Sequence, residues 1–241
     1  EKIKNGLNQS IILAEEIQED IKKLNKEILQ KNKIGWQEKK KARDILQKQK
    51  ELEKRITETK KDNSNSLKTK EKLNSSILEK QKELENLMNK VLDEEMKKML
   101  EEMEQMLDKV DKEKLKDLLD KLSEENKDLE KELDRELQLF KQLEFEQKVE
   151  ETIEKIKEIK QLQKNLKEET LDKKLKTKNA ELAKKQDLIS EQMDSVKKIL
   201  SEIKKINMEL EDKNKLPKTK KLEEEISQKM SESKDALKKG I

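Results

Sequence analysis

The sequence predicts an all-α protein, an elongated assembly of helical hairpins and coiled coil without a β-sheet. Charged residues make up 48% of the 241-residue chain, and its 59 basic side chains nearly balance 56 acidic ones, which is typical of long helices. No Gly or Pro, the residues that most often interrupt a helix, occurs from Trp36 to Leu216. Apolar residues recur at spacings of three and four, the period of one helical face.

Four segments are expected along the chain. They are an N-terminal helical hairpin at 1–61, a Met-rich helical segment at 62–122, a long coiled-coil helix at 123–214 and a C-terminal helix at 215–241. Gly35 divides the hairpin into two helices. The Asp, Asn and Ser residues at 62–66 predict a loop, because their side chains compete for backbone hydrogen bonds. Asp111 and Ser123 are the expected N-caps of two further helices.

The long coiled-coil segment has one place where a turn fits, near 168–178, because apolar residues become sparse there. Pro217 marks the end of this segment, since Pro disfavours the helical conformation in the residue before it. The last helix is expected to run from about 219 to Lys239, with Gly240 as its C′ residue.

The clearest heptad pattern lies late in the chain, where spacings of four and three alternate. The predicted coiled-coil seam consists of Ile189, Met193, Val196, Leu200, Ile203, Asn207 and Leu210. Such a pattern of a and d positions is typical of a helix that packs along a partner helix. Asn207 has two interpretations: a buried Asn at an a position would fix the register, or its side chain is simply exposed.

A second stripe is rich in methionine and keeps the same spacing. It consists of Leu92, Met96, Met99, Met103, Met106 and Val110. Flexible thioether side chains suit a surface that accepts several protein partners. The alternative is the internal core of a hairpin, and we favour it because a contiguous exposed apolar stripe is uncommon.

The three aromatic residues are candidate anchors for partners. Phe140 and Phe145 lie in the densest apolar cluster, but their spacing of five does not fit one narrow seam, which favours a helix with two neighbours. Trp36 directly follows Gly35. Its ring either closes the turn between two helices or stays exposed as an anchor, and we expect it to close the turn.

The residue types that most catalytic sites need are missing. The chain has no His and no Cys, which removes the commonest general base, the commonest metal ligand and the thiolate nucleophile. It has no glycine-rich phosphate loop. Its acidic pairs lack the burial that would separate two carboxyl pKa values. We therefore predict that the protein is not an enzyme and uses no cofactor, no metal and no small-molecule substrate.

Nucleic-acid binding is also disfavoured. The best basic run is Lys39–Arg43, but the net charge is only +3 and aromatic stacking residues are nearly absent. The remaining partners are other proteins or further copies of this chain, joined through helices.

Several strings resemble the helical region of the large membrane-anchored envelope proteins of Bacteroidota, which are catalogued only as a domain of unknown function. The resemblance rests on Val91–Glu102, Asn126–Glu144, Glu150–Ile156 and Leu210–Pro217, and it extends over nearly the whole chain. It implies a parent protein with transmembrane helices near its N-terminus, then β-rich sequence, then this helical part on the periplasmic side of the inner membrane. It carries over no catalytic residues.

These observations favour a non-enzymatic structural or interaction module, a scaffold, spacer or docking platform, within a larger membrane-anchored protein of the cell envelope. Because the chain begins at Glu1 rather than Met, we expect it to be part of a longer protein, which alone would contact the membrane. The alternative is a holdase-type chaperone that grips unfolded clients with helical tentacles. A coiled coil that binds nucleic acid is the weaker third hypothesis.

Overall fold

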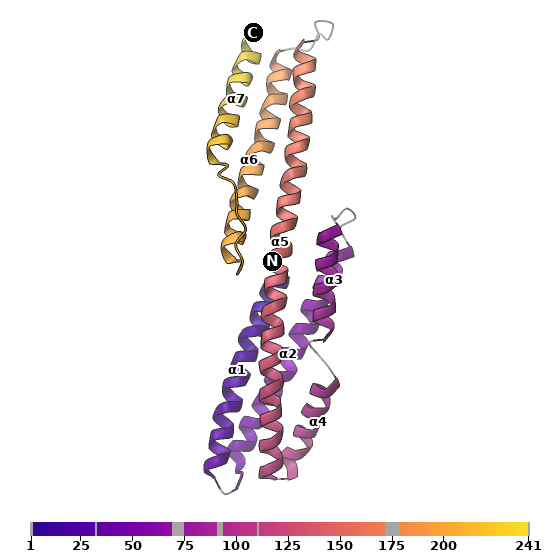
Figure 1. Cartoon of the computed structure of the whole chain (residues 1–241), viewed down its shortest axis with the longest axis vertical. Coiled ribbons are helices and arrows are strands. Elements are labelled where there is room, and N and C mark those ends of the chain that lie inside the picture. The colour runs from indigo at the N-terminus through magenta and orange to yellow at the C-terminus, as the bar shows by residue number, and fades with distance from the viewer. Residues whose placement is uncertain are drawn as a thin grey trace. The chain divides into compact units, whose positions relative to one another are not determined.

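A computed structural model describes residues 2–31, 33–68, 75–90, 94–109, 111–171 and 179–240. Within these ranges the chain forms seven helices and no strand, so the all-α prediction is confirmed (Figure 1). The helices are α1 (Lys2–Gln30), α2 (Trp36–Lys68), α3 (Ser75–Lys90), α4 (Glu94–Lys109), α5 (Lys112–Leu171), α6 (Asn179–Glu209) and α7 (Lys220–Lys239).

The chain divides into two compact units, Glu1–Leu143 and Glu144–Ile241. The single helix α5 contributes its first part to the N-terminal unit and its second part to the C-terminal unit. The boundaries expected at 61, 122 and 214 do not coincide with this division. The physical reason is that the long α5 carries one apolar face into the core of each unit.

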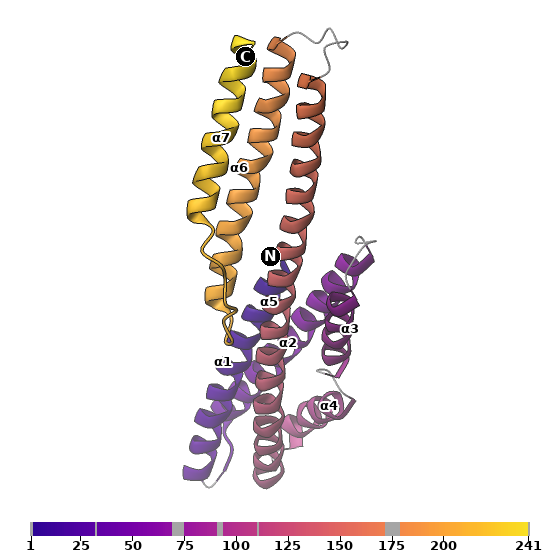
Figure 2. The ribbon, with the colours of Figure 1, turned by 45° about the horizontal axis from the view of Figure 1, so that its top comes forward.

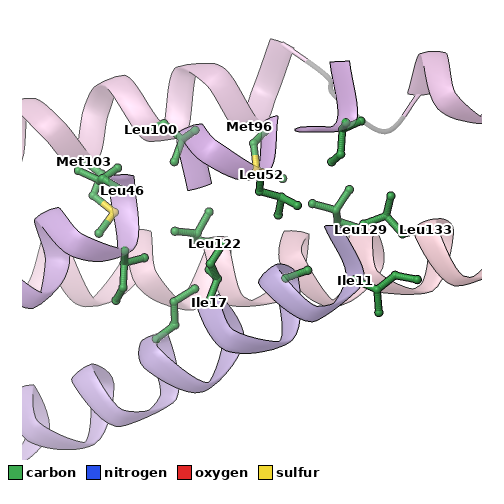
Figure 3. Close-up of a cluster of buried hydrophobic side chains, with 14 of the residues drawn as sticks. Ile11, Ile17, Leu46, Leu52, Met96, Leu100, Met103, Leu122, Leu129 and Leu133 are labelled. Atoms are coloured by element: carbon green, nitrogen blue, oxygen red, sulfur yellow. The ribbon is translucent and has the colours of Figure 1, made fainter. Parts of the chain in front are cut away.

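The N-terminal unit is a helical bundle with a continuous apolar core. Helix α1 buries its face at spacings of three and four, and Ile17, Ile21 and Leu24 have no exposed surface. Helices α3 and α4 both pack on α2, and the core also takes in the first part of α5. Figure 3 shows side chains from α1, α2, α4 and α5 meeting in this core, among them Ile17 and Leu122.

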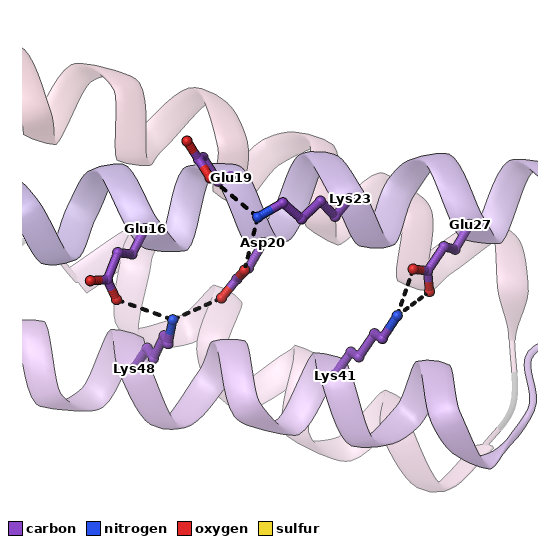
Figure 4. Close-up of polar contacts among 7 residues, drawn as sticks. All are labelled: Glu16, Glu19, Asp20, Lys23, Glu27, Lys41 and Lys48. Carbon is purple, nitrogen blue, oxygen red and sulfur yellow. Dashed lines mark hydrogen bonds and ion pairs between the residues drawn. The ribbon is translucent and has the colours of Figure 1, made fainter.

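Helices α1 and α2 form an antiparallel hairpin whose edge is lined by ion pairs (Figure 4). Lys48 Nζ lies 3.2 Å from a Glu16 oxygen and 2.9 Å from an Asp20 oxygen. Nearer the turn, Lys41 Nζ contacts both carboxylate oxygens of Glu27, at 2.5 and 2.6 Å. Such exposed pairs contribute little to stability individually, so the buried apolar face is what holds the hairpin together.

The turn between α1 and α2 is closed by a carboxylate and not by an aromatic ring. The Gly35 N–H donates to Glu38 Oε2 at 2.8 Å, which is half of a capping box, and Glu38 also pairs with Lys31. The hydrogen bonds from Lys31 and then from Gly35 hold the pKa of the Glu38 carboxyl below its ordinary value. Trp36 is 72% exposed beside Lys40, so the expectation that its ring closes the turn is wrong.

Two local predictions fail because polar residues occupy inward-facing positions. The loop expected at 62–66 is helical, since α2 continues to Lys68. Thr59 and Asn63 are buried and extend the inward stripe of α2 beyond Ile56. Ser123 caps nothing and lies inside α5, where its hydroxyl accepts a hydrogen bond from Gln18 Nε2 at 2.9 Å.

Two predicted helix ends are confirmed. Asp111 Oδ1 accepts the Lys114 N–H at 3.2 Å and caps α5. Gly240 closes α7 in the left-handed conformation, with φ at 71° and its N–H directed at the Ala236 and Leu237 carbonyls. These ends were predictable because each depends on residues within one helical turn.

The N-terminal unit also buries polar groups that find no partner among the described residues. Asn126 and Glu136 have no exposed surface, and neither the Asn126 amide nor the Glu136 carboxyl has a hydrogen-bond partner there. Burial, followed by the nearby charge of Glu132, raises the pKa of Glu136 to about 8. An uncompensated carboxyl of this kind weakens the bundle whenever it must ionise.

The close approach of α1 and α2 at Gly6 leads to a testable prediction. A Cβ atom at Gly6 would lie 2.2 Å from Thr59 Oγ1. Gly→Ala inside a helix ordinarily stabilises by about 1 kcal/mol, but we expect Gly6→Ala to destabilise by about 1–2 kcal/mol because the clash outweighs this gain. Urea unfolding followed by circular dichroism measures the effect.

The second variant, Thr59→Ala, serves as the control for this prediction. It removes the clashing hydroxyl and leaves the Thr59 Cβ at 3.2 Å, which a small shift can relieve. In that background Gly6→Ala should become neutral or stabilising. A destabilisation of the same size in both backgrounds would contradict the contact between the two residues.

A candidate helix-docking groove in the C-terminal unit

The C-terminal unit consists of the second part of α5 with α6 and α7. In both Figures 1 and 2, α6 lies between α5 and α7. Two ion pairs show how these helices run: Lys148 bonds to Glu202 at 2.7 Å and Lys185 to Glu169 at 2.5 Å, so α5 and α6 are antiparallel. The chain therefore reverses between α5 and α6, in the region where the sequence left room for a turn. Residues 172–178 themselves lie outside the described ranges.

A polar layer ties the three helices together. Gln163 of α5 and Gln186 of α6 exchange two amide hydrogen bonds, at 2.8 and 3.1 Å. The Ser233 hydroxyl of α7 donates to the Gln186 oxygen at 3.1 Å. Because Gln186 is fully buried and its bonds are directional, this layer fixes the register of all three helices. The apolar pattern alone does not reveal this layer, although Leu182, Gln186 and Ile189 continue the four-three spacing of the seam.

Between α5 and α7 lies an open groove of about 740 Å³. Its apolar lining comes from α5, from Met193 of α6 and from α7. Leu222 and Leu171 are 58% and 68% exposed in this groove, and Ile156 is 45% exposed. A contiguous apolar surface of this kind marks an interaction site more often than a single exposed leucine does.

The walls of the groove are long and nearly parallel. The α5 wall runs from Ile156 to Leu171 and the α7 wall from Leu222 to Leu237. Fifteen residues along a helix correspond to about 22 Å, or about four helical turns. Small side chains, Ser233 and Ala236, form part of the α7 wall and keep it open to a bulky neighbour.

The charges at the groove are one-sided. Its lining includes Lys160, Lys164 and Lys167, all exposed on α5, and none of the described residues that line it carries a carboxylate. A smaller hollow of about 510 Å³ adjoins it along α7 and adds Glu225 and Lys229, one charge of each sign. The main groove thus combines an apolar floor with a cationic rim on one wall.

The predicted seam faces the inside of the C-terminal unit. Six of its seven residues are buried, and Leu200 is partly buried against two apolar clusters. Asn207 is 9% exposed and acts locally: its amide donates to the Asn214 carbonyl at 2.9 Å and accepts the Asn214 N–H at 2.8 Å. Asn207 therefore holds the segment that follows α6 through these two local hydrogen bonds.

The Met-rich stripe lies inside the N-terminal unit wherever it is described. Met96 and Met103 are buried, while Met99 and Met106 are partly buried against the same core. The Gln49 amide of α2 donates to Met96 Sδ at 3.0 Å. Leu92 and Val110 lie outside the described residues. This burial favours the interpretation of the stripe as internal core over that of a partner surface.

Oxidation provides a direct test of this placement. We expect mild peroxide to oxidise Met208, which is 66% exposed, well before Met103, which has no exposed surface. Sulfoxide formation needs access to the sulfur, so Met96 and Met103 should react only after unfolding in urea. Peptide mass spectrometry of the folded and unfolded chain measures both rates. Rapid oxidation of Met103 in the folded chain would instead indicate an accessible stripe.

The two phenylalanines contribute to different units. Phe140 packs partly buried on the core of the N-terminal unit, whereas Phe145 is 7% exposed in a cluster with α6 residues. They are core residues and not exposed anchors. Trp36 alone among the three aromatic residues is freely accessible.

Other kinds of site are not evident in the described part of the chain. Its acidic side chains form no group of three suited to hold a metal ion. Among the same residues, no helix combines the length and the apolar character that crossing a bilayer requires. Comparison with protein-family models, curated proteins and solved structures finds no match.

Proposed function

We propose that the chain is a non-enzymatic protein-interaction module that docks a helical segment of another protein in the groove between α5 and α7. The observation that supports this function is the groove itself, an open apolar trough of about 740 Å³ in a unit whose helices are otherwise held in fixed register. Rigid elements that present a preformed apolar groove are the usual basis of helix recognition.

The wider setting is also a proposal. We propose that the module belongs to a larger membrane-anchored protein of the cell envelope and acts there as a scaffold or docking platform on the periplasmic side. The support is the sequence resemblance described above. In this proposal the predicted coiled-coil seam is the buried face through which α6 packs between α5 and α7.

Two matched double variants test the docking function. Ile156→Glu/Leu222→Glu places two charges in the groove. Leu188→Glu/Met208→Glu changes two residues of α6 that are 60% and 66% exposed and do not line it. We expect the protein partners isolated with the intact parent to be retained by the control variant and lost from the groove variant. Equal recovery from both variants would contradict the proposal.

The same variants separate docking from chaperone activity. A holdase would slow the aggregation of an unrelated, chemically unfolded protein, and the groove variant would lose this effect. A docking platform has no such effect in either form. Suppression of aggregation by the unmodified chain would therefore favour the holdase function.

A further inference from the structure

We infer that the partner helix is amphipathic and carries carboxylates along one flank, and that these carboxylates face the lysines of α5. This inference rests on the proposed function and specifies the chemistry of its partner. It follows from the shape of the groove, from the sign and position of the charges around it, and from the pairing of those charges within the chain.

The shape favours a helix over a smaller ligand. The two walls run about 22 Å in the same direction, because α5 and α7 are each antiparallel to α6. For α7 this follows from its contacts with α6, where Gln186 meets Ser233 and Lys204 meets Glu223. A fourth helix laid between them would complete a bundle, with its apolar stripe on the floor that Met193 and Leu166 form. About four turns of such a helix fit the length of the walls.

The charge pattern assigns the flank. Lys160, Lys164 and Lys167 follow one another at spacings of four and three, so their ammonium groups line one face of α5. Carboxylates at the same spacing on a neighbouring helix would meet them along the groove. A basic flank in that position would be repelled by three like charges instead.

These lysines are available for a partner. Lys164 lies 3.9 Å from Glu168, and both side chains are about two-thirds exposed, so this pair is weak. Lys160 and Lys167 form no ion pair with another described residue. The nearby Glu169 is directed to Lys185 of α6 at 2.5 Å, which leaves the rim cationic.

The α7 wall of the groove is uncharged, unlike the α5 wall with its three lysines. Its lining residues in the main groove are Leu222, Ile226, Met230, Ser233, Ala236 and Leu237, none of them charged. The flank of the partner that faces α7 is therefore expected to be apolar or small. Charge on one flank and apolar residues on the other also set the direction in which the helix can lie.

Two synthetic helical peptides of about 22 residues test the inference with the full chain. Both carry the same leucine stripe; one has glutamates along one flank and the other has lysines at those positions. We expect the acidic peptide to bind at least about tenfold more tightly at low salt, with the difference shrinking as salt screens the charges. Fluorescence anisotropy of labelled peptides measures both affinities.

The variant Lys160→Glu/Lys164→Glu/Lys167→Glu provides the matched reversal. All three side chains are exposed, so the fold should be retained, and a circular dichroism melt checks this. In this variant the basic peptide should become the tighter ligand. The separate groove variant, Ile156→Glu/Leu222→Glu, should bind both peptides more weakly than the unmodified chain does.

Three outcomes would overturn the inference. If the two peptides bind with equal affinity and the groove variant binds neither, the inferred acidic flank is wrong. The docking function would then still be supported, with a partner helix of other chemistry. Binding of neither peptide would reject the amphipathic acidic helix, and the isolation experiment above would then decide the docking function separately. Self-association that depends on the groove, seen by sedimentation, would identify a second copy of the chain as the occupant.

Discussion

Glu136→Gln is expected to increase the free energy of unfolding by about 5 kcal/mol near pH 9 and to change it little near pH 5. Glutamine keeps the size and polarity of a protonated carboxyl, but it cannot ionise. The variant therefore removes the cost of charging a group that has no exposed surface and no hydrogen-bond partner among the described residues. Urea unfolding across the pH range measures the difference.

The sign follows from the shifted pKa. The pKa of Glu136 is raised to about 8 in the folded chain, against the ordinary value of 4.5. Below the ordinary value both states hold the proton and the residue has no effect on stability. Between the two values the unfolded state gives up its proton while the folded state keeps it, so stability falls as pH rises. Above about 8 the loss is complete, and the gain from Glu136→Gln is largest.

Asp134→Asn is the matched control, because this neighbouring carboxylate on α5 is exposed. This substitution also replaces a carboxyl by an amide, but at an exposed site, and it should not reproduce the gain of Glu136→Gln near pH 9. A profile for Glu136→Gln parallel to that of the unmodified chain would show that the carboxyl is hydrated or paired in solution.

The fold class was accessible from the sequence because it depends on local properties. Helices need residues that do not interrupt them and a stripe to bury, and both are visible in the order of residues. The caps at Asp111 and Gly240 belong to the same category. The failures at 62–66 and Ser123 have the opposite cause: a polar residue was taken as a break, whereas packing against another helix kept it helical.

The groove was not accessible in the same way. Ile156 and Leu222 are 66 positions apart and meet in one surface only because α6 holds α5 and α7 beside it. The sequence pattern of an apolar helical face is the same whether another helix of the chain covers that face or leaves it exposed. Periodicity therefore cannot distinguish a buried face from an exposed one. The Met-rich stripe and the groove show the two outcomes of the same pattern.

The polar layer explains how the C-terminal unit can keep a groove open. An apolar bundle of three helices can slide or rotate to cover exposed leucines. The bonds among Gln163, Gln186 and Ser233 are lost in such a shift, and a buried amide without a partner is costly. The layer therefore favours one arrangement, in which the apolar wall stays exposed.

Val196→Asp is expected to cause the second large change in the free energy of unfolding, because it disrupts the packing of α6. Val196 has no exposed surface, so the substitution removes an apolar contact and places an unpaired carboxylate in the core. We expect a loss of about 4 kcal/mol or more, measured by urea unfolding. Ser195→Asp adds the same charge one position away, at an exposed site, and should change stability by no more than about 0.5 kcal/mol. Similar losses for the two variants would mean that α6 does not bury the face on which Val196 lies, and the groove that depends on this packing would lose its structural basis.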